Sequence, residues 1–204
     1  MKGNFQSDER RVVNNHDEYY ENKFQERAVY ISPGKFECTT DPNVLLVSKV
    51  GSGVTICIHD PEVKLGGMLQ LVMPENLTLD FPRIDTEDPG YKQTAELIVE
   101  FVSALKRQGA GKSRIKIKLF GGTSIFEEFV DGGLKNYVFA KEWLIEKGLM
   151  IASEDIGGMD CRRIMFQARK GKIHCFKMRR DSDKEELRAQ EKEYMDQLTQ
   201  QIGT

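Results

Sequence analysis

Residues 49–75, KVGSGVTICIHDPEVKLGGMLQLVMPE, hold two short apolar runs, each preceded by glycine. One run follows Gly51-Ser52-Gly53 and the other follows Gly66-Gly67. Short apolar runs bounded by turn residues predict buried β-strands. A tight turn on a rigid scaffold is a frequent place for a catalytic side chain, yet Gly53 at this turn carries none. The stretch therefore has the backbone pattern of an active site without its nucleophile.

The chain on both sides of this stretch alternates strands with helices. Apolar residues at helical spacing predict a buried helix within residues 88–109 and a second one over 135–147 that ends at Gly148. Further strands are predicted at AVYIS (28–32), NVLLVSKV (43–50), RIKIKLF (114–120), LMIASED (149–155), CRRIMFQAR (161–169) and KIHCFKMRR (172–180). A turn at Lys170-Gly171 joins the last two strands. This order predicts a protein of the α/β class.

Composition excludes several classes of function. The net charge of -2, from 30 basic and 32 acidic residues, gives no overall field that favours nucleic acid or anionic lipid. The longest apolar runs, such as 44–47 and 69–73, are far shorter than the roughly 20 residues of a membrane helix. The first residues, MKGNFQSDERR, lack the apolar core of a signal peptide. We expect a cytoplasmic protein that neither inserts into a membrane nor binds nucleic acid.

The four cysteines indicate no metal centre. Cys38, Cys57, Cys161 and Cys175 lie at wide spacings and include no C-x-x-C pair. This pattern predicts neither a zinc site nor a disulfide framework, so we expect reduced, mostly buried thiols. We expect no metal and no cofactor.

Three parts of the chain differ in composition. Residues 1–26 are polar and predict a flexible N-terminal extension. Residues 27–180 hold the predicted strands and helices and form the expected folded domain. Residues 181–204 predict a charged amphipathic helical tail that docks on the domain or on a partner. Its apolar stripe consists of Leu187, Tyr194, Leu198 and Ile202.

Four blocks of sequence carry a resemblance to a known family. In chain order they are DPEVKLGGMLQLVMPE, YKQTAELIVEFV, RIKIKLFGGTSIF and SEDIGGMDCRRIMFQARKGKI. Together they resemble the chemoreceptor glutamine deamidase family, CheD, over residues 28–178. The resemblance implies a layered α/β/β/α sandwich of mixed sheets. It also implies a cytoplasmic enzyme that converts glutamine side chains on chemoreceptors to glutamate, with a CheC-type phosphatase as a partner that competes for the same surface.

Hydrolysis of a carboxamide needs three groups that converge. A thiolate attacks, a neighbouring imidazole holds the thiol ionised and protonates the ammonia, and a third group orients the imidazole. In the family the cysteine follows Gly-Ser at the turn, the histidine follows Gly-Gly-Met, and a threonine lies six residues before the cysteine. The resemblance places these positions at Gly53, Gln70 and Val47, none of which can perform the required step.

Substitute groups can be considered. Cys57 and His59 are two residues apart, so a strand would point both to the same face. A buried, inert Cys57 is nevertheless the usual interpretation of a thiol within the apolar run VTICI. Ser48 and Ser52 offer hydroxyl groups, but the motif supplies no histidine to activate them.

Cys161 is the remaining candidate thiol, because it precedes Arg162 and Arg163. Positive neighbours lower the pKa of a thiol. We expect Cys161 to be a strand residue beside two solvated cations.

Two hypotheses remain at this point. The first is a binding protein without catalysis that recognises a chemoreceptor cytoplasmic helix or a CheC-type phosphatase. The second is an active glutamine deamidase with a relocated nucleophile such as Cys57. The absence of all three expected groups favours the first. Its binding surface is expected at the retained pocket frame, which consists of Gly51, Ser52, Gly53, Gly66, Gly67, Gln70, Gly121, Gly122, Gly157 and Gly158.

Overall fold

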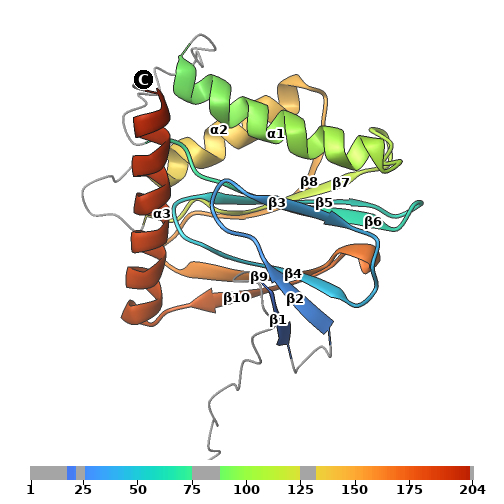
Figure 1. Cartoon of the computed structure of the whole chain (residues 1–204), viewed down its shortest axis with the longest axis horizontal. Coiled ribbons are helices and arrows are strands. Elements are labelled where there is room, and N and C mark those ends of the chain that lie inside the picture. Colours follow the sequence, from blue (N-terminus) through green and yellow to red (C-terminus); the bar gives the residue numbers. More distant parts are fainter. Residues whose placement is uncertain (1–17, 22–25, 75–87, 125–131, 203–204) are drawn as a thin grey trace, which may run out of the picture.

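The computed structural model describes residues 18–21, 26–74, 88–124 and 132–202, and its strands form two five-stranded sheets (Figure 1). The first sheet has the order β1 (Glu18–Glu21), β2 (Glu26–Tyr30), β4 (Val44–Val50), β9 (Cys161–Gln167) and β10 (Lys172–Met178). The second has the order β3 (Phe36–Thr39), β6 (Leu65–Leu71), β5 (Val54–Asp60), β7 (Lys116–Gly121) and β8 (Ile151–Ile156). Each sheet contains one parallel pair, β2 with β4 and β7 with β8, among antiparallel neighbours. The expected mixed sheets are confirmed.

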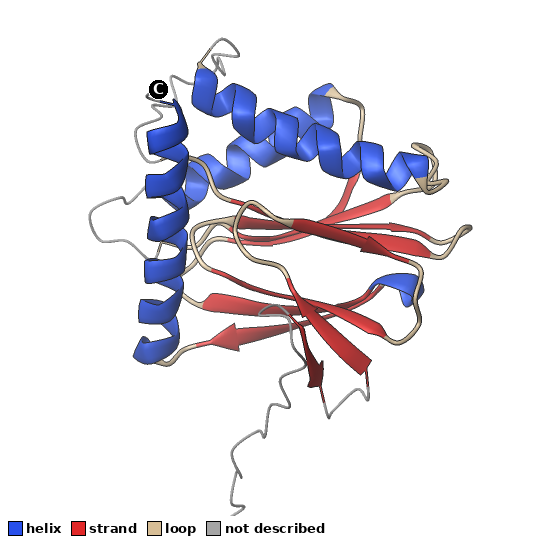
Figure 2. Cartoon of the chain, viewed as in Figure 1, coloured by secondary structure: helices blue, strands red, loops and turns tan. Residues whose placement is uncertain are grey.

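Helices complete the layers (Figures 1 and 2). Helices α1 (Pro89–Arg107) and α2 (Gly132–Glu146) cover one face of the second sheet, and the first sheet packs on its other face. Helix α3 (Asp181–Ile202) stands upright across one end of both sheets (Figure 1). The α/β sandwich with a charged C-terminal helix is therefore confirmed.

Local sequence accounts for the helix ends. The Asp88 side chain accepts hydrogen bonds from the N–H groups of Gly90 and Tyr91, and Pro89 occupies the first turn of α1. Gly148 has a φ of +63°, the left-handed conformation that ends α2 where the sequence predicts it. Helix α2 begins at Gly132, three residues before the predicted start at 135.

Two strands were not predicted, because each spans only four residues. Strand β1 lies within the segment that was expected to be flexible and pairs antiparallel with β2. The flexible extension over residues 1–26 stays a prediction, within which residues 18–21 form this short strand. Residues 1–17 and 22–25 lie outside the described residues.

The apolar core has two main layers. One lies between the helices and the second sheet and includes Ile56, Leu69, Phe101 and Phe139. The other lies between the two sheets and includes Leu46, Cys57, Met68 and Phe166. Because β6 is covered on both faces, all seven of its residues are buried. Burial on both faces explains why Gln70 is the only side chain of this strand that is polar.

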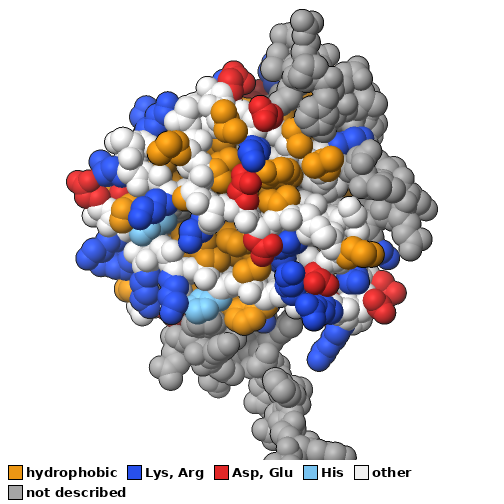
Figure 3. All heavy atoms as spheres, turned by 180° about the vertical axis from the view of Figure 1, so that it is seen from behind, with side chains coloured by type: hydrophobic (Ala, Val, Ile, Leu, Met, Phe, Trp, Pro, Cys, Tyr) orange, Lys and Arg blue, Asp and Glu red, His pale blue; other side chains and the backbone are white. Residues whose placement is uncertain are grey.

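The surface mixes charge types. On the face seen in Figure 3, lysine and arginine side chains are interspersed with acidic and apolar ones. This distribution fits the small net charge of the chain. Among the described residues, no helix is both long enough and apolar enough to cross a lipid bilayer.

Candidate functional site

The loop Gly51-Ser52-Gly53 connects β4 of the first sheet to β5 of the second and is buried throughout. Its three carbonyl groups are fixed by neighbouring segments. The N–H of Thr123 donates to Gly51 O at 2.9 Å, and the N–H of Gly122 donates to Gly53 O at 2.8 Å. The Ser52 carbonyl accepts from the Asn136 side chain of α2 at 3.0 Å. The loop is therefore held rigidly at the corner between the sheets.

The donors of the same loop all point to one carboxylate, that of Glu191 on α3. Its Oε1 accepts from the N–H of Gly51 at 2.9 Å and from the N–H of Gly53 at 3.2 Å. Its Oε2 accepts from the N–H of Ser52 at 3.0 Å and from the Ser52 hydroxyl at 2.6 Å. We call these three N–H groups and the Ser52 hydroxyl the carboxylate nest. Consecutive backbone N–H groups that converge in this way form an anion-binding concavity.

Burial and hydrogen bonding act in opposite directions on Glu191. Its side chain is 0% exposed, and this burial raises the pKa of Glu191 above its ordinary value. The hydrogen bonds from Ser52, Gly51 and Gly53 oppose that rise because they favour the ionised form. Hydrogen bonds to a charged group contribute roughly 1.5–3 kcal/mol each. The nest therefore supplies the compensation that a buried carboxylate requires.

Gly53, the position of the expected nucleophile, has no room for a side chain. A Cβ atom there would lie 2.7 Å from the Leu71 carbonyl oxygen and 2.7 Å from Val72 Cγ2. It would also lie 3.4 Å from Glu191 Oε1. A cysteine at this position would therefore require the loop to shift.

Gln70, at the position of the expected histidine, is fully buried between the sheets. Its Oε1 accepts from the Ser48 hydroxyl at 3.0 Å, and its Nε2 donates to Lys49 O at 3.0 Å. The Ser48 Oγ lies 3.1 Å from Thr55 Oγ1 as well. The amide of Gln70 is thus committed to an internal network that joins the two sheets.

Val47, at the position of the expected threonine, lies away from this network. It is buried in a separate cluster with Ala28, Leu45 and Met165. Neighbouring residues on a strand point to opposite faces, so Val47 and Ser48 diverge. The hydroxyl that contacts residue 70 therefore comes from Ser48.

Neither candidate substitute forms a catalytic pair. Cys57 and His59 share a face of β5, as the spacing predicts, but Cys57 is 1% exposed within the core between the sheets. Burial raises the pKa of the Cys57 thiol, which opposes thiolate formation. Burial also lowers the pKa of His59, whose ring packs against Gly171 in the turn before β10.

The remaining thiols are also held in the protonated form. Burial raises the pKa of Cys38 to about 12 and that of Cys161 and Cys175 to about 11. The expectation that Arg162 is a solvated cation is wrong, because its side chain is only 3% exposed. It donates to Thr123 Oγ1 and to Asp155, and so ties β9 to the segments beside the loop.

The structure brings only part of the predicted pocket frame together. Gly122 bonds to the loop, and the N–H of Gly157 donates to Gly121 O at 2.8 Å. Gly158 accepts from the N–H of Ser124 at 3.1 Å. Gly66 and Gly67 lie away from the loop. Leu71, whose carbonyl oxygen is beside Gly53, is roughly 17 Å along β6 from Gly66 at ~3.4 Å per residue. The two glycines permit close packing instead, since a Cβ on Gly66 would lie 2.6 Å from Ala168 O and one on Gly67 would lie 2.7 Å from Phe101.

The sequence did not predict two residues of the site, Glu191 and Asn136. Asn136 accepts from the N–H of Met73 at 2.7 Å in addition to its bond to Ser52. A signal for Glu191 was present, since it lies four residues after Leu187 and four before Met195, both buried. A carboxylate on the apolar stripe of a helix predicts a buried partner. The described residues contain no group of three or more metal-ligating side chains.

Known proteins resemble this chain. The family model described as CheD chemotactic sensory transduction matches residues 83–177. A Caulobacter vibrioides (strain NA1000 / CB15N) protein named probable chemoreceptor glutamine deamidase CheD is 32% identical over 150 residues, covering 72% of this chain and 78% of that protein. A protein of the same name from Ralstonia pickettii (strain 12J) is 29% identical over 191 residues, or 91% of this chain and 77% of its own length. A solved structure, the Bacillus licheniformis hypothetical protein YfiH, shares 14% identity over 60% of this chain and 49% of its own, with a TM-score of 0.39.

Proposed function

This chain belongs to the CheD family of chemotaxis proteins, and from that membership we propose that it binds chemoreceptor cytoplasmic helices, or a CheC-type phosphatase, without deamidating glutamine. Its relatives are named as probable chemoreceptor glutamine deamidases. In this proposal the chain still binds the chemoreceptor but no longer hydrolyses its glutamine side chains. It includes a cytoplasmic location, where the target helices lie.

One observation supports the proposed loss of activity. The turn residue is Gly53, and a buried carboxylate covers the turn. Removal of a catalytic nucleophile alone costs on the order of a million-fold in turnover. Gln70 and Val47 add to this, since one is bound in an internal network and the other faces away. Neither side chain can exchange a proton with a substrate near neutral pH.

The alternative, a relocated nucleophile at Cys57, has no support from its surroundings. A reactive thiol needs exposure and a positive environment. Cys57 is buried in the apolar layer between the sheets, and burial raises its pKa. The binding protein is therefore the better proposal.

Binding would involve the rim around the loop. Gly158 is exposed, and the neighbouring Met159 is 75% exposed, so both are accessible as the structure stands. The residues Gly51 to Gly53 are buried beneath Glu191, so a partner would reach them only after α3 has moved, and Gln70 lies deeper, between the two sheets. Their role in binding is part of the proposal.

The test is an assay for both parts of the proposal. The chain is incubated with a chemoreceptor cytoplasmic fragment, and peptide masses are followed for the gain of roughly one dalton that accompanies conversion of glutamine to glutamate. We expect no gain, together with association in the micromolar range, or roughly -8 kcal/mol, by calorimetry. A gain that Cys57→Ala abolishes would establish the relocated nucleophile instead. Absence of heat with both the receptor fragment and a CheC-type protein would refute the binding function.

A further inference from the structure

Every group of the carboxylate nest donates a hydrogen bond to Glu191, and only the Ser52 hydroxyl could also accept one. Its four donors are the three backbone N–H groups of residues 51–53 and the Ser52 hydroxyl, which all bond to Glu191. An ionised carboxylate presents only acceptors and can satisfy all four donors. A carboxamide would turn an NH2 group toward N–H groups and leave at least one donor unpaired. The nest therefore distinguishes glutamate from glutamine.

The helix that fills the nest has few other buried contacts. Besides Glu191, only Leu187, Met195 and Leu198 of α3 are buried. Three other polar contacts of α3 are partly or largely exposed. They join Lys49 to Glu186 at 3.1 Å, Tyr30 to Gln190 at 3.2 Å and Gln93 to Gln201 at 2.8 Å. The one ion pair among them, Lys49–Glu186, has a carboxylate that is 50% exposed, and surface ion pairs contribute only ~0–1 kcal/mol.

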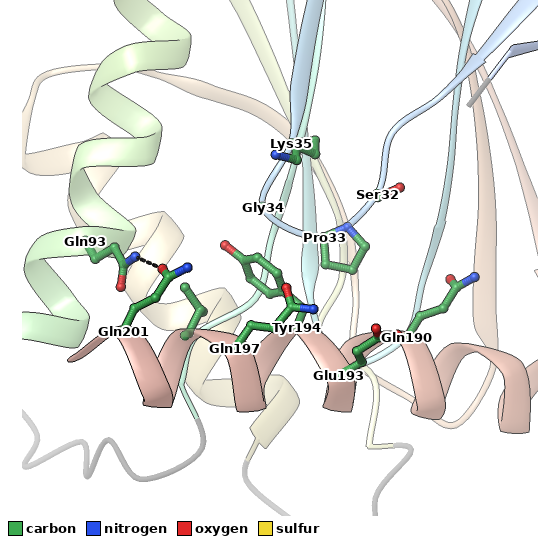
Figure 4. A pocket seen from close by; sticks show the side chains of 11 residues that line it. Ser32, Pro33, Gly34, Lys35, Gln93, Gln190, Glu193, Tyr194, Gln197 and Gln201 are labelled. Carbon is green, nitrogen blue, oxygen red and sulfur yellow. Dashed lines mark hydrogen bonds between the residues drawn. The ribbon is translucent and has the colours of Figure 1, made fainter. Parts of the chain in front are cut away.

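A polar pocket that is open to solvent lies beside α3. It has a volume of about 490 Å³ and lies between α3 and the turn at residues 32–35 (Figure 4). Glutamine side chains of α3 and of α1 line it, together with Tyr194, which contacts Gly34. Polar side chains make up most of this lining, so separation of the helix would expose little apolar surface to water here.

Release of α3 would leave both sheets intact. The helix follows the last strand, β10, and pairs with no strand among the described residues. The carbonyl groups of the loop would stay bound to Thr123, Asn136 and Gly122, so the nest would keep its shape. An open nest would then present its donors to another chain.

We propose that the carboxylate nest is a binding site for a glutamate side chain on a partner helix, and that α3 is a tethered ligand which occupies this site until the partner replaces it. This inference rests on the proposed function, because the partner helix is that of a chemoreceptor. The chain would recognise the product of deamidation, glutamate, in preference to the glutamine from which it is made.

The first experiment tests the nest with acetate as the probe. Glu191→Ala in the full chain removes a group with the size and charge of acetate. We expect sodium acetate to raise the thermal midpoint of Glu191→Ala more than sodium chloride or acetamide does, and to have no such effect on Asp196→Ala, which alters an exposed acidic residue of the same helix. Equal responses to acetate and acetamide would overturn the carboxylate site. If Glu191→Ala does not fold, rescue of its folding by acetate and not by acetamide supports the site, and no rescue by either overturns it.

The second experiment tests the selectivity and the release of α3. A synthetic peptide of residues 181–202 and the same peptide with Glu191→Gln are titrated into the full chain carrying Glu191→Ala. We expect the glutamate peptide to bind at least about tenfold more tightly, because only it pairs all four donors. Equal affinities would overturn the inference.

A receptor fragment separates the two proposals. Two versions are compared, one with glutamine and one with glutamate at the deamidated positions, while hydrogen exchange is followed in α3 of the native chain. We expect tighter binding of the glutamate version and faster exchange in α3. Binding that leaves α3 protected refutes the tethered ligand and preserves the proposed function. Failure of both versions to bind refutes the proposed function. The acetate and peptide experiments then test only whether the nest binds a carboxylate.

Discussion

The hydroxyl group of Ser52 donates a 2.6 Å hydrogen bond to the carboxylate of Glu191, a residue 139 positions later in the chain. This bond joins the corner between the two sheets to the C-terminal helix. This buried contact contributes more to the stability of the docked helix than the more exposed polar contacts of α3 do, because both of its partners have been removed from water.

Glu191→Gln should destabilise the fold, because the introduced NH2 group faces the donors of the nest. We expect the free energy of unfolding to fall by about 1–3 kcal/mol. Urea unfolding measures this change. The matched control is Asp196→Asn, on the exposed side of the same helix, with an expected change within ~0.5 kcal/mol. Similar losses for the two variants would contradict the role of Glu191.

A thiol introduced by Gly53→Cys should react slowly with iodoacetamide. The side chain would crowd the Leu71 carbonyl oxygen and Val72, and α3 covers the position. We expect labelling to accelerate when Glu191→Ala is added, since the helix is then held less firmly. The native chain, with its four buried or half-buried thiols, provides the background rate. Rapid labelling in Gly53→Cys alone would show that the turn is open.

Asp60→Asn should weaken the fold in a pH-dependent manner. Burial by itself would raise the pKa of Asp60, but the Arg114 guanidinium and three backbone N–H groups hold this pKa at about 2. Because the folded-state pKa lies below the ordinary 3.8, ionised Asp60 stabilises the fold above about pH 4 and loses this effect as the pH falls toward 2. We expect a loss of roughly 1–2 kcal/mol near neutral pH that shrinks toward about pH 2.

The matched control for Asp60 is Glu62→Gln, which removes the other carboxylate beside Arg114. The Glu62 side chain is 70% exposed, so its ion pair at 3.0 Å should contribute less than about 1 kcal/mol. Urea unfolding at several pH values measures both variants. A loss in Asp60→Asn that stays constant down to about pH 2 would contradict the assigned ionisation.

Ser48→Ala should destabilise the contact between the sheets by about 1–3 kcal/mol, since Gln70 Oε1 loses its donor inside the core. Gln70→Leu alone removes one of the two partners of the Ser48 hydroxyl, the other being Thr55 Oγ1. The double variant should lose less stability than the sum of the two single ones, because neither polar group is then left unpaired. Additive losses would show that these side chains do not interact.

Strand positions followed from the sequence, because their apolar runs reflect local burial. The runs at 43–50 and 53–60 correspond to β4 and β5, and the half-exposed pattern at 114–120 corresponds to β7. The four-residue strands β1 and β3 did not stand out, since so short a segment has no clear period. Their pairing is determined by neighbouring strands and not by their own sequences.

The turn at residues 51–53 was also recognised from the sequence, whereas the group that covers it was not. A glutamate in a charged helix usually faces water, and although the position of Glu191 on the apolar stripe indicates burial, nothing local identifies its partner 139 positions away. The network of Ser48 and Gln70 was missed for the same reason, because it depends on how the two sheets face each other. Contacts between distant segments decide the chemistry of this site.

The order of the elements along the chain affects the order in which they can fold. Both sheets are complete once Met178 has been synthesised, whereas the nest lacks its carboxylate until Glu191 follows. We therefore expect folding to finish at the corner between the sheets, with docking of α3 as the last step. Pulse-labelled hydrogen exchange during refolding should show the amides of residues 51–53 becoming protected later than those of β5. The final event of folding would then be the same motion that closes the binding site, so the refolding rate of this helix would measure how quickly the open site closes.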